Sequence, residues 1–550
     1  MDAYSNIEQI YKKMVGFQGL EDVRLSIFPI LKENWGGQFP FEYFVSLERL
    51  VVDDSAIISN GISSHLLGYL KKLKVLIVEK CDLVGQVFDL EGVNSVECGI
   101  NQMEKLNELH LIDLPKLTHV WSKDPQQIMS FENLQLLKVH NCANLNYVFD
   151  ISMALSLPNL QHVEVKNCSL MEHIIVKEER EKMQDYQTIF PSLQSMNLHH
   201  LTNLLSFYST NGFLECPPLE TIEVVECPKM TLFASTFSNG QDSCMIAEEK
   251  EELISNEIMF LGNKMAIPGL EELKVEWNSL EGLLFGKNQP GFLHSLKCIE
   301  LTGFQGEEYA ILPSNFLQHF PKLEKLALSD ALVEEINLQE LSFLKGKDAE
   351  SVALLTKLKL SNLPKLKHLV HDDSQLVPLF QNLEDLEVVE CSRLKILVPS
   401  TVSFQNLINL EVSKCDGLIN LMTASTARSL VQLKRMNVKD CKMMQEIVAI
   451  SSDGVEYEIR FSQLEYVGLD DLPCLTSFCS GNYAFHFPSL KEVMVTGCLN
   501  MKFFTEQVPT APMLRKVKTG TRVYDWEWEG SLNNTIQALF LGKDSDETDT

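Results

Sequence analysis

The amino-acid sequence predicts an α/β repeat fold, a solenoid of short stacked strands, instead of several separate globular domains. Two observations carry this prediction: one leucine-based frame recurs along most of the 550 residues, and apolar and polar residues alternate within each copy of it. Alternation is typical of a strand with one buried face, because successive side chains point to opposite sides. A composition of 45% hydrophobic and 22% charged residues also indicates a folded chain.

The frame reads L-x-x-L-x-V-x-x-C-x-x-L, with exchanges among aliphatic residues. It is clearest in residues 131–149 (FENLQLLKVHNCANLNYVF) and 380–398 (FQNLEDLEVVECSRLKILV). Its first leucine occurs seventeen times, at Leu20, Leu47, Leu73, Leu106, Leu134, Leu160, Leu193, Leu219, Leu270, Leu296, Leu323, Leu355, Leu383, Leu407, Leu433, Leu464 and Leu490. This predicts a leucine-rich-repeat solenoid, a horseshoe with a parallel sheet on the concave face and irregular or short helical convex segments.

The frame also predicts which side chains of a unit are buried. In the unit that begins at Leu134, Leu137 and Val139 should point into the core, while Lys138 and His140 should point outward. A single unit cannot bury its apolar face alone, so we expect the stability to come mainly from contacts between neighbouring units.

The ninth position of the frame is a cysteine in eight units, namely Cys81, Cys142, Cys168, Cys227, Cys391, Cys415, Cys441 and Cys498. Metal binding or a ladder of disulfides would be one interpretation. The other is a small buried residue whose thiol is a weak hydrogen-bond donor. Zinc sites use pairs such as C-x-x-C, and the sequence has none, so we expect these cysteines to be packed in the core.

A second type of unit has leucine followed by proline at this position, as in Leu111–Leu117, Leu360–Leu366 and Leu469–Leu475. Proline fixes φ and lacks a backbone donor. We therefore expect the proline to end the strand and to turn the chain outward.

Changes in composition predict five segments. Residues 1–16 are read as an N-terminal extension and residues 17–233 as a first leucine-rich-repeat block. Residues 234–268, which contain the run Glu248–Glu252, are read as an acidic loop or linker. A second repeat block follows over residues 269–530, and residues 531–550 are expected to form an acidic C-terminal tail.

Motifs for catalysis or for cofactor binding are missing from the sequence. The nearest match to a phosphate-binding loop, Gly282–Asn288, is one residue short and lacks the hydroxyl residue. No nucleophile elbow, zinc-protease helix or kinase signature occurs. The adjacent His199 and His200 should point to opposite faces of a strand, so they would not hold a metal together. We predict a protein that is not an enzyme, with no cofactor and no catalytic or metal-binding residue.

The charge balance argues against nucleic acid as a partner. The 47 Lys and Arg residues face 75 Asp and Glu residues, and the formal net charge of −28 repels phosphates over most of the surface. The sequence contains no run of about 18 uncharged apolar residues, so no membrane-spanning helix is expected. Residues 1–13 lack the apolar stretch of a secretory signal, so the fourteen cysteines indicate reduced thiols and a cytoplasmic location.

The outward side of the strands remains as the place where a partner would bind. Such a wall suits a protein surface, which it would hold through many modest polar contacts. The candidates for this concave binding surface are His110, Lys138, His140, Glu164, Asn197, His199, Glu223, Lys274, Glu300, Lys359, Glu387, Glu411 and Asn437.

The combination of the two unit types resembles a known family. The segments that carry the resemblance are Leu134–Cys142, Leu111–Leu117, Phe190–Leu193, Phe487–Leu490 and Val87–Gly92. They are similar to the leucine-rich-repeat region of plant intracellular disease-resistance receptors of the coiled-coil, nucleotide-binding class. The resemblance extends over residues 17–505.

The resemblance implies a region that senses a pathogen effector or a guarded host protein and restrains a nucleotide-driven switch. No phosphate-binding loop precedes the repeats, so ATP binding is not implied. The expectation is the sensing region of an immune receptor or a truncated relative, for which a nucleotide-binding receptor module in trans is a further partner. The alternative is a general leucine-rich-repeat scaffold or adaptor without an immune role.

Overall fold

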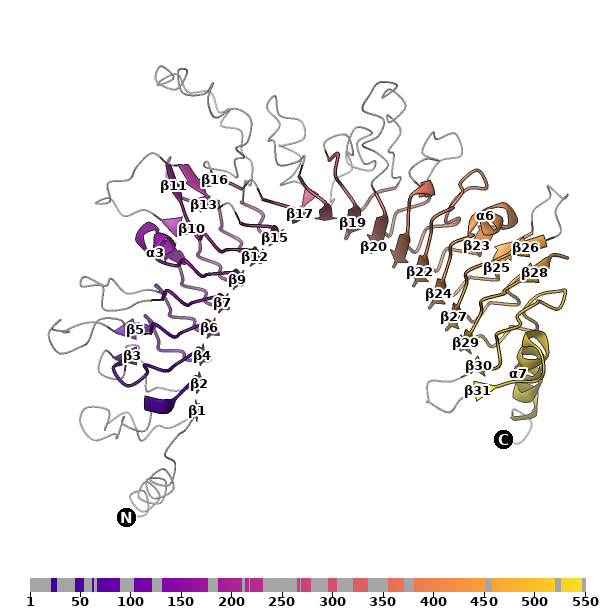
Figure 1. The fold of residues 1–550 in the computed structure, drawn as a ribbon, viewed down its shortest axis with the longest axis horizontal. Coiled ribbons are helices and arrows are strands. Elements are labelled where there is room, and N and C mark those ends of the chain that lie inside the picture. Colours follow the sequence, from indigo (N-terminus) through magenta and orange to yellow (C-terminus); the bar gives the residue numbers. More distant parts are fainter. Residues whose placement is uncertain are drawn as a thin grey trace, which may run out of the picture. The chain divides into compact units, whose positions relative to one another are not determined.

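The computed structural model describes residues 21–26, 45–53, 62–63, 67–89, 103–120, 131–176, 186–209, 213–216, 218–230, 265–267, 269–277, 295–303, 320–334, 355–369, 380–450, 458–519 and 526–546. The chain divides into two compact units, residues 1–292 (unit 1) and 293–550 (unit 2). Each unit is built around one main sheet, whose strands follow one another in the order of the sequence (Figure 1).

The main sheet of unit 1 is entirely parallel over its described strands. Each strand is paired with the next one in the chain, residue by residue and without a slip in register. The strands are β1 (Asp22–Ser26), β2 (Arg49–Asp53), β4 (Val75–Glu79), β6 (Glu108–Ile112), β7 (Leu136–His140), β9 (His162–Lys166), β12 (Ser195–His199), β15 (Thr221–Val225) and β17 (Glu272–Glu276).

The main sheet of unit 2 follows the same plan and ends in a short antiparallel pair. Its parallel strands are β18 (Cys298–Thr302), β19 (Lys325–Ser329), β20 (Lys357–Ser361), β21 (Asp385–Val389), β22 (Asn409–Ser413), β24 (Arg435–Lys439), β27 (Tyr466–Asp470), β29 (Glu492–Thr496) and β30 (Val517–Lys518). The strand β31 (Trp526–Glu527) runs antiparallel to β30.

Small sheets and short helices form the opposite side of each unit (Figure 1). In unit 1 these elements are β3 (Ile62–Ser63), β5 (Phe88–Asp89), β8 (Phe149–Asp150), β10 (His173–Val176), β11 (Tyr186–Thr188), β13 (Ser206–Tyr208), β14 (Phe213–Glu215), β16 (Met265–Ala266) and α3 (Ile151–Leu155). In unit 2 they are β23 (Asn420–Thr423), β25 (Glu446–Ala449), β26 (Glu458–Arg460), β28 (Ala484–His486) and α6 (Ala424–Ser429). The predicted repeat solenoid, with short helical convex segments, is therefore confirmed.

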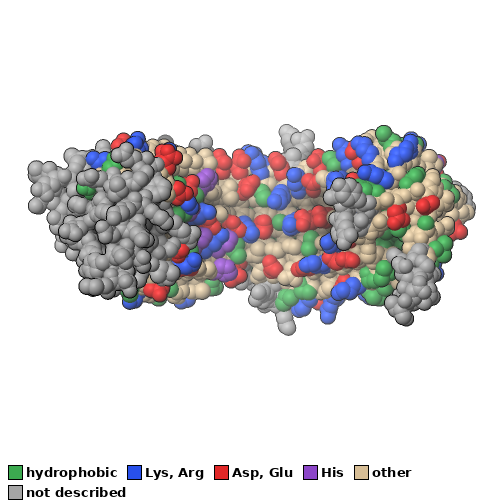
Figure 2. All heavy atoms as spheres, turned by 90° about the horizontal axis from the view of Figure 1, so that it is seen from below, with side chains coloured by type: hydrophobic (Ala, Val, Ile, Leu, Met, Phe, Trp, Pro, Cys, Tyr) green, Lys and Arg blue, Asp and Glu red, His purple; other side chains and the backbone are tan. Residues whose placement is uncertain are grey.

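Burial alternates along the main strands as the frame predicts. In β7, the side chains of Leu137 and Val139 are buried, whereas Lys138 and His140 are half-buried on the open side of the sheet. The open side carries charged residues of both signs between neutral ones (Figure 2). Because the strands are in register, the buried residues of neighbouring repeats stack on one another. They form one core in unit 1 and one core in unit 2.

The eight cysteines of the frame are buried, as predicted, and each thiol approaches a backbone carbonyl. The Cys415 Sγ atom donates to the Val388 carbonyl of the preceding unit at 3.7 Å and to the Ser413 carbonyl at 3.3 Å. Burial raises the pKa of Cys227 to about 12, so this thiol keeps its proton. These eight cysteines are unbridged thiols that pack in the turn after their strands and hydrogen-bond weakly there.

The turn after fourteen of the described main strands begins with a residue in the left-handed conformation. Fourteen such residues have φ between 51° and 74°: Lys80, Asp113, Asn141, Asn167, His200, Glu226, Gly303, Asp330, Asn362, Glu390, Lys414, Asp440, Asp471 and Gly497. This conformation aims the backbone N–H at the next unit. The N–H of Asn141, for example, donates to the Lys166 carbonyl at 2.9 Å. The turn thereby adds one more hydrogen bond to the ladder beyond the end of the strand.

The same geometry corrects the expected role of proline. In the segment Leu111–Leu117 the strand ends at Ile112, and the chain turns at Asp113, where φ is 56°. Leu114 is buried at the position that cysteine has in the other units, and Pro115 comes only after it. The left-handed residue therefore ends the strand in both unit types, and the proline lies within the turn that follows.

Gly497→Ala is expected to lower the free energy of unfolding by about 1–3 kcal/mol, because the added methyl group would be overpacked. Gly497 has φ of +64°, and a Cβ atom would lie 2.9 Å from Asp471 Cα and 3.0 Å from Asp471 N. Gly530→Ala is the matched control, since Gly530 also has positive φ but no atom lies within 4 Å of the point that its Cβ would occupy. Urea unfolding should show a larger loss of free energy of unfolding for Gly497→Ala than for Gly530→Ala. Equal losses would contradict the close contact between the neighbouring repeats that contain Gly497 and Asp471.

The predicted linker over residues 234–268 does not separate two sheets. The strand β17, which follows it, pairs in register with β15, which precedes it. Within the linker the structure describes residues 265–267, where β16 pairs with β14. The compact units divide instead between residues 292 and 293. The expected acidic loop is otherwise outside the described residues, as is the N-terminal extension over residues 1–16.

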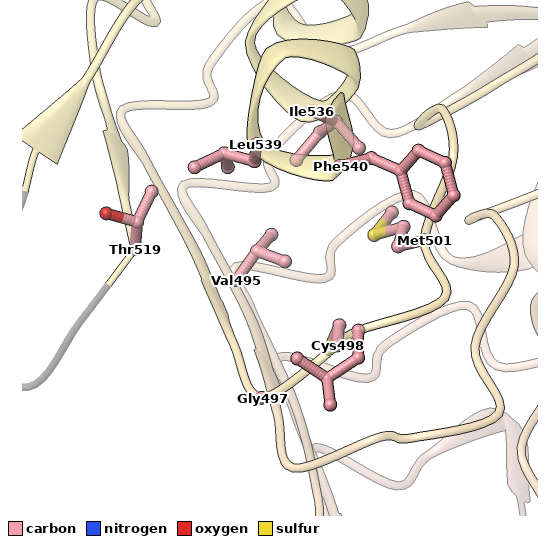
Figure 3. A pocket seen from close by; sticks show the side chains of 9 residues that line it. Val495, Gly497, Cys498, Met501, Thr519, Ile536, Leu539 and Phe540 are labelled. Atoms are coloured by element: carbon pink, nitrogen blue, oxygen red, sulfur yellow. The ribbon is translucent and has the colours of Figure 1, made fainter. Parts of the chain in front are cut away.

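The expected C-terminal tail over residues 531–550 is corrected by a helix. The helix α7 (Leu532–Asp546) packs on the last unit, with Leu532 and Ile536 buried. It borders a small pocket of about 130 Å³ (Figure 3), lined by Val495, Gly497, Cys498, Leu499, Met501, Thr519, Ile536, Leu539 and Phe540. The tail was predicted because the segment is acidic, but its apolar residues Leu532 and Ile536 pack the helix against the core.

Candidate functional site

The outward side chains lie in three rows across each main sheet, because the first, third and fifth residues of every strand point away from the core. All thirteen predicted residues are on these rows. His140 and His199 belong to the fifth-residue row, and the other eleven belong to the middle row. Eight are in unit 1, from His110 to Lys274, and five are in unit 2, from Glu300 to Asn437. All are half-buried except Glu411, which is exposed.

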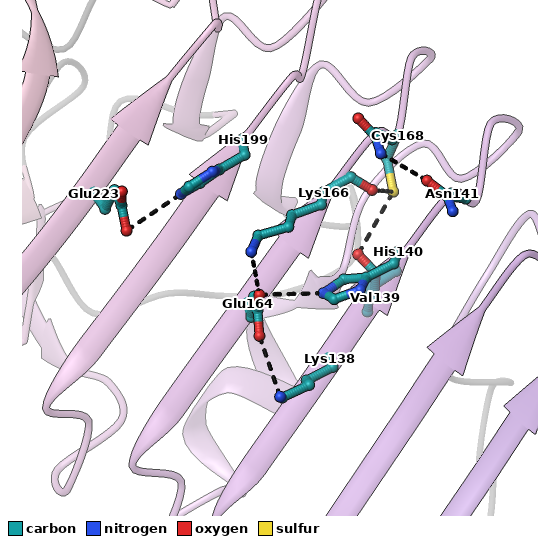
Figure 4. Close-up of polar contacts among 10 residues, drawn as sticks. Lys138, Val139, His140, Asn141, Glu164, Lys166, Cys168, His199 and Glu223 are labelled. Atoms are coloured by element: carbon teal, nitrogen blue, oxygen red, sulfur yellow. Dashed lines mark hydrogen bonds and ion pairs between the residues drawn. The ribbon is translucent and has the colours of Figure 1, made fainter. Parts of the chain in front are cut away.

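Glu164 is the centre of the first cluster in unit 1 (Figure 4). Its carboxylate lies 3.4 Å from Lys138 Nζ and 3.4 Å from His140 Nε2, and it also forms an ion pair with Lys166. Burial favours a higher pKa for Glu164, but the Lys166 hydrogen bond and the neighbouring positive charges outweigh it, so its pKa is lowered. The carboxylate is therefore held as an anion between β7 and β9.

Glu223 is the centre of a second cluster. It lies 2.7 Å from Lys274 Nζ and 3.3 Å from His199 Nε2. Burial again opposes ionisation, yet the Lys274 hydrogen bond and charge, with His199, lower the pKa of Glu223. Since β12, β15 and β17 are adjacent, the ion pairs also fix the outward side chains of neighbouring units relative to one another. Such pre-ordered side chains lose less entropy when a partner binds.

Three histidines on this face favour the neutral form. Burial lowers the pKa of His110, His140 and His199, although a carboxylate lies near each of them. Each Nε2 atom is buried and lies 3.3–3.4 Å from a carboxylate oxygen, that of Glu108, Glu164 or Glu223. The adjacent His199 and His200 face different neighbours, because His200 Nδ1 lies 2.5 Å from Glu226 Oε2 in the turn. The two histidines do not occupy opposite faces of one strand, as was predicted, because β12 ends at His199 and His200 is the exposed left-handed residue of the turn.

Acidification is expected to destabilise unit 1 through these histidines. Their pKa is lower in the folded chain than in the unfolded chain, so the unfolded chain binds more protons below the unfolded pKa of about 6.5. The contribution to stability is therefore complete above that pH and declines as the pH falls through it. Urea midpoints at pH of about 7.5 and 5.5 should differ more for the wild type than for a variant with glutamine at positions 110, 140 and 199. An identical pH dependence in both would contradict this assignment.

Unit 2 has ion pairs of the same kind. Lys359 Nζ lies 2.8 Å from Glu387 Oε1 on the next strand, and Lys439 Nζ lies 3.2 Å from Asp470 Oδ2. Glu411, between these two pairs, forms no ion pair with another described residue and is exposed to solvent. Asn437 follows it in the middle row on β24. This face thus combines neutralised pairs with an accessible negative charge.

The candidates predicted from the sequence do not include the most distinctive residues of this face. Arg435, Tyr466, Gly468 and Met494 are also outward on β24, β27 and β29. The Arg435 guanidinium lies 4.5 Å from the centroid of the Tyr466 ring. Their frame positions would have located them, since Gly468 and Met494 each come four residues after a first leucine. They were missed because the prediction took only polar residues and mainly one row.

Clusters of metal-ligating side chains and membrane-spanning helices were sought among the described residues. Within the described ranges, no group of three or more His, Cys, Asp or Glu side chains is arranged to hold a metal ion. No described helix is long and apolar enough to cross a membrane. The pocket beside α7 is lined mainly by apolar side chains and contains no acid–base pair.

Comparisons with solved structures give leucine-rich-repeat proteins. A protein from Bacteroides eggerthii is 12% identical, with 80% of this chain and 75% of that chain covered and a TM-score of 0.32. A protein from Leptospira interrogans is 15% identical, with 78% and 96% covered and a TM-score of 0.24. The leucine-rich-repeat domain of APL1B is 13% identical, with 77% and 88% covered and a TM-score of 0.28. No curated protein matches the chain.

The family models identify the repeats more closely. The model described as plant disease resistance protein RPS2-like, leucine-rich repeats, matches residues 19–169, 156–240, 269–403 and 400–510. These matches include both unit types and most of the chain, in agreement with the stacked strands and the cysteine and leucine turns. The chain belongs to the RPS2-like leucine-rich-repeat family of plant disease resistance proteins.

Proposed function

We propose that the chain is a non-enzymatic protein-recognition solenoid that acts in plant defence. It would be the sensing region of an intracellular immune receptor, or a truncated relative of one, and would work in the cytoplasm. The observation that carries the proposal is the set of outward rows, in which ion pairs fix charged side chains on successive strands. The family of the repeats supports the role in defence.

The geometry suits a protein partner. Adjacent strands are about 4.8 Å apart, so the outward rows present side chains at a regular spacing over many strands. Both signs of charge are present, and the pairs are only half-buried, so each contributes about 1 kcal/mol or less to folding. Partner side chains that match the pattern would gain many modest contacts, while a mismatched surface would meet like charges. The expected partners are a pathogen effector, a guarded host protein or a nucleotide-binding receptor module in trans.

A charge swap tests this role without loss of the fold. In the double variant Lys359→Glu with Glu387→Lys, the ion pair between β20 and β21 can form again with its direction reversed. The melting temperature should stay close to that of the wild type. A partner that reads this face should bind more weakly, because each of its charges now meets a like charge.

The measurement is quantitative affinity purification from infected and from healthy plant tissue, with the wild type and the swapped variant as baits. Support would be a protein that is enriched from infected tissue by the wild type and lost with the variant. A matched control is Lys442→Ala, which removes an exposed ion pair with Asp416 in a turn. If all baits capture the same proteins from both tissues, the chain is a general scaffold and the proposed immune role is wrong.

A further inference from the structure

One part of the outward face in unit 2 differs in composition from all the others. Over the described outward positions of β2 to β29, Tyr466 is the only tyrosine, phenylalanine or tryptophan, Met494 the only methionine and Gly468 the only glycine. Arg435 is one of two arginines there. These four residues, with Asn437, occupy three adjacent strands, β24, β27 and β29, and are called the aromatic patch below.

The side chains of the aromatic patch hold one another in place. The Arg435 guanidinium packs against the Tyr466 ring at 4.5 Å from its centroid, and the Tyr466 hydroxyl donates to Met494 Sδ at 3.9 Å. Gly468 makes room for the ring, since a Cβ atom at this position would lie 2.8 Å from Tyr466 Oη and 3.0 Å from Tyr466 Cε1. The ring therefore lies along the sheet, over the strand from which it comes.

An arrangement of this kind is suited to bind a partner strongly. Tyrosine, arginine and methionine are enriched at the centres of protein interfaces, where a few residues provide most of the binding energy. The contacts with Arg435 and Met494 restrict the tyrosine before binding, so little side-chain entropy remains to be lost. The tyrosine is half-buried and presents apolar area beside a polar hydroxyl.

The charges around the aromatic patch indicate the character of the partner. Lys439 is neutralised by Asp470 at 3.2 Å, and Arg435 is engaged with the tyrosine ring. Glu411 on β22 and Glu492 on β29 flank the patch and form no ion pair with another described residue. Lys518 on β30, in register with Met494, adds a positive charge on the β29 side of the patch. The unmatched charge is therefore negative on the β22 side, at Glu411, where a basic residue of the partner is favoured.

We propose that the aromatic patch is the energetic centre of the outward face of unit 2, and that it takes a basic protein segment. The segment places an aromatic or large aliphatic side chain against Tyr466 and Met494, and a lysine or arginine at Glu411. Glu411 is two strands from Tyr466, about 10 Å, which an extended segment crosses in about three residues. This inference rests on the proposed function, since it assigns the partner chemistry of the same face.

A peptide display library tests the proposal without a known partner. Peptides of about twelve residues are long enough, at about 3.3 Å per residue, to cross the patch. The library is selected on the full chain, and the affinities of the enriched peptides are measured by fluorescence polarisation. The expected peptides have an aromatic or large aliphatic residue with lysine or arginine about three residues away. Enrichment without this pattern would overturn the proposal.

Three variants locate the binding site. Tyr466→Ala should weaken the selected peptides by about tenfold or more, as for a hot-spot residue. Gly468→Ala should weaken them with little loss of stability, because the atoms nearest to the new methyl group belong to the Asn437 and Tyr466 side chains and not to the backbone, so the ring is pushed from its position. Glu411→Lys should abolish the preference for basic peptides. Ser361→Ala, an outward change on β20, is the control and should leave affinity within about twofold.

The outcomes separate this inference from the proposed function. If the peptides bind Tyr466→Ala as tightly as the wild type, the aromatic patch is not the centre of binding, even when a partner from infected tissue still responds to the charge swap at Lys359 and Glu387. If the peptides depend on Tyr466 but tissue yields no infection-dependent partner, the patch stands as a binding site and the immune role fails. Melting temperatures of all variants show that a loss of affinity is not a loss of fold.

Discussion

Leu410→Asp is expected to unfold the stack around β22, with a loss of about 4 kcal/mol or more in the free energy of unfolding. Leu410 is 3% exposed and is paired in register with Leu386 on one side and Met436 on the other, both of which are buried. A carboxylate at this position would lose its water without gaining a positive partner. Chemical denaturation followed by circular dichroism measures the loss.

Glu411→Ala is the matched control for Leu410→Asp. Glu411 is the next residue in the same strand, points to the other side of the sheet and is exposed. Its removal should change the free energy of unfolding by less than about 0.5 kcal/mol. Similar losses in the two variants would mean that the inward and outward faces of the strands have been exchanged.

Asn533→Leu is expected to cost about 3 kcal/mol, because it strips hydrogen bonds from buried backbone groups at the end of the solenoid. The Asn533 Oδ1 atom accepts from the N–H groups of Phe504 and Thr505, each at 3.1 Å, and its Nδ2 atom donates to the Thr505 carbonyl at 2.7 Å. The side chain is 6% exposed, so water cannot easily take its place. The last turn would otherwise offer its open backbone to another chain.

Asn534→Ala separates this capping role from a general effect on α7. Asn534 is exposed, and its contact with Ser531 uses the backbone N–H, which alanine keeps. Thermal unfolding and light scattering should show a lower melting temperature and earlier aggregation for Asn533→Leu alone. If both variants melt like the wild type, α7 does not protect the end of the sheet.

The period of the leucines was enough to predict the main sheets. The alternation in segments such as residues 136–140 fixes which side chains are buried, and identical frames place the strands in register. The left-handed turns were not predicted, because residues as different as Lys80, Asn141 and Glu390 occupy them. Their conformation follows from the hydrogen bond to the next unit, a contact between distant residues that a single frame does not reveal.

The end of the solenoid was harder to predict than its interior. The segment that forms α7 was read as a tail because its last residues are acidic. The helix is ordered by the packing of Leu532 and Ile536 and by the hydrogen bonds of Asn533. These hydrogen bonds pair backbone groups of the last turn. A capping segment lacks the repeat frame by its nature, so periodicity cannot locate it.

The candidate surface was predicted in position but not in chemistry. The frame placed Lys138 and Glu164 on the open side, but only the register of β7 and β9 brings them to 3.4 Å. Tyr466 was left out because the prediction took mainly the middle residue of each strand, and Tyr466 is the first residue of β27. Its outward direction follows from its place two residues after Leu464, and its support by Gly468 needs the three-dimensional structure.

The open face of the main sheet, and not another side of the coil, is proposed to hold the protein partner. Carboxyl footprinting by mass spectrometry tests it most directly, with the chain free and bound to a partner purified from plant tissue. The account predicts that Glu387, Glu411 and Glu492 on the open face lose reactivity in the complex, while Asp416 and Glu506 in the turns keep theirs. Protection of the turn carboxylates alone, with the strand carboxylates unchanged, would contradict it.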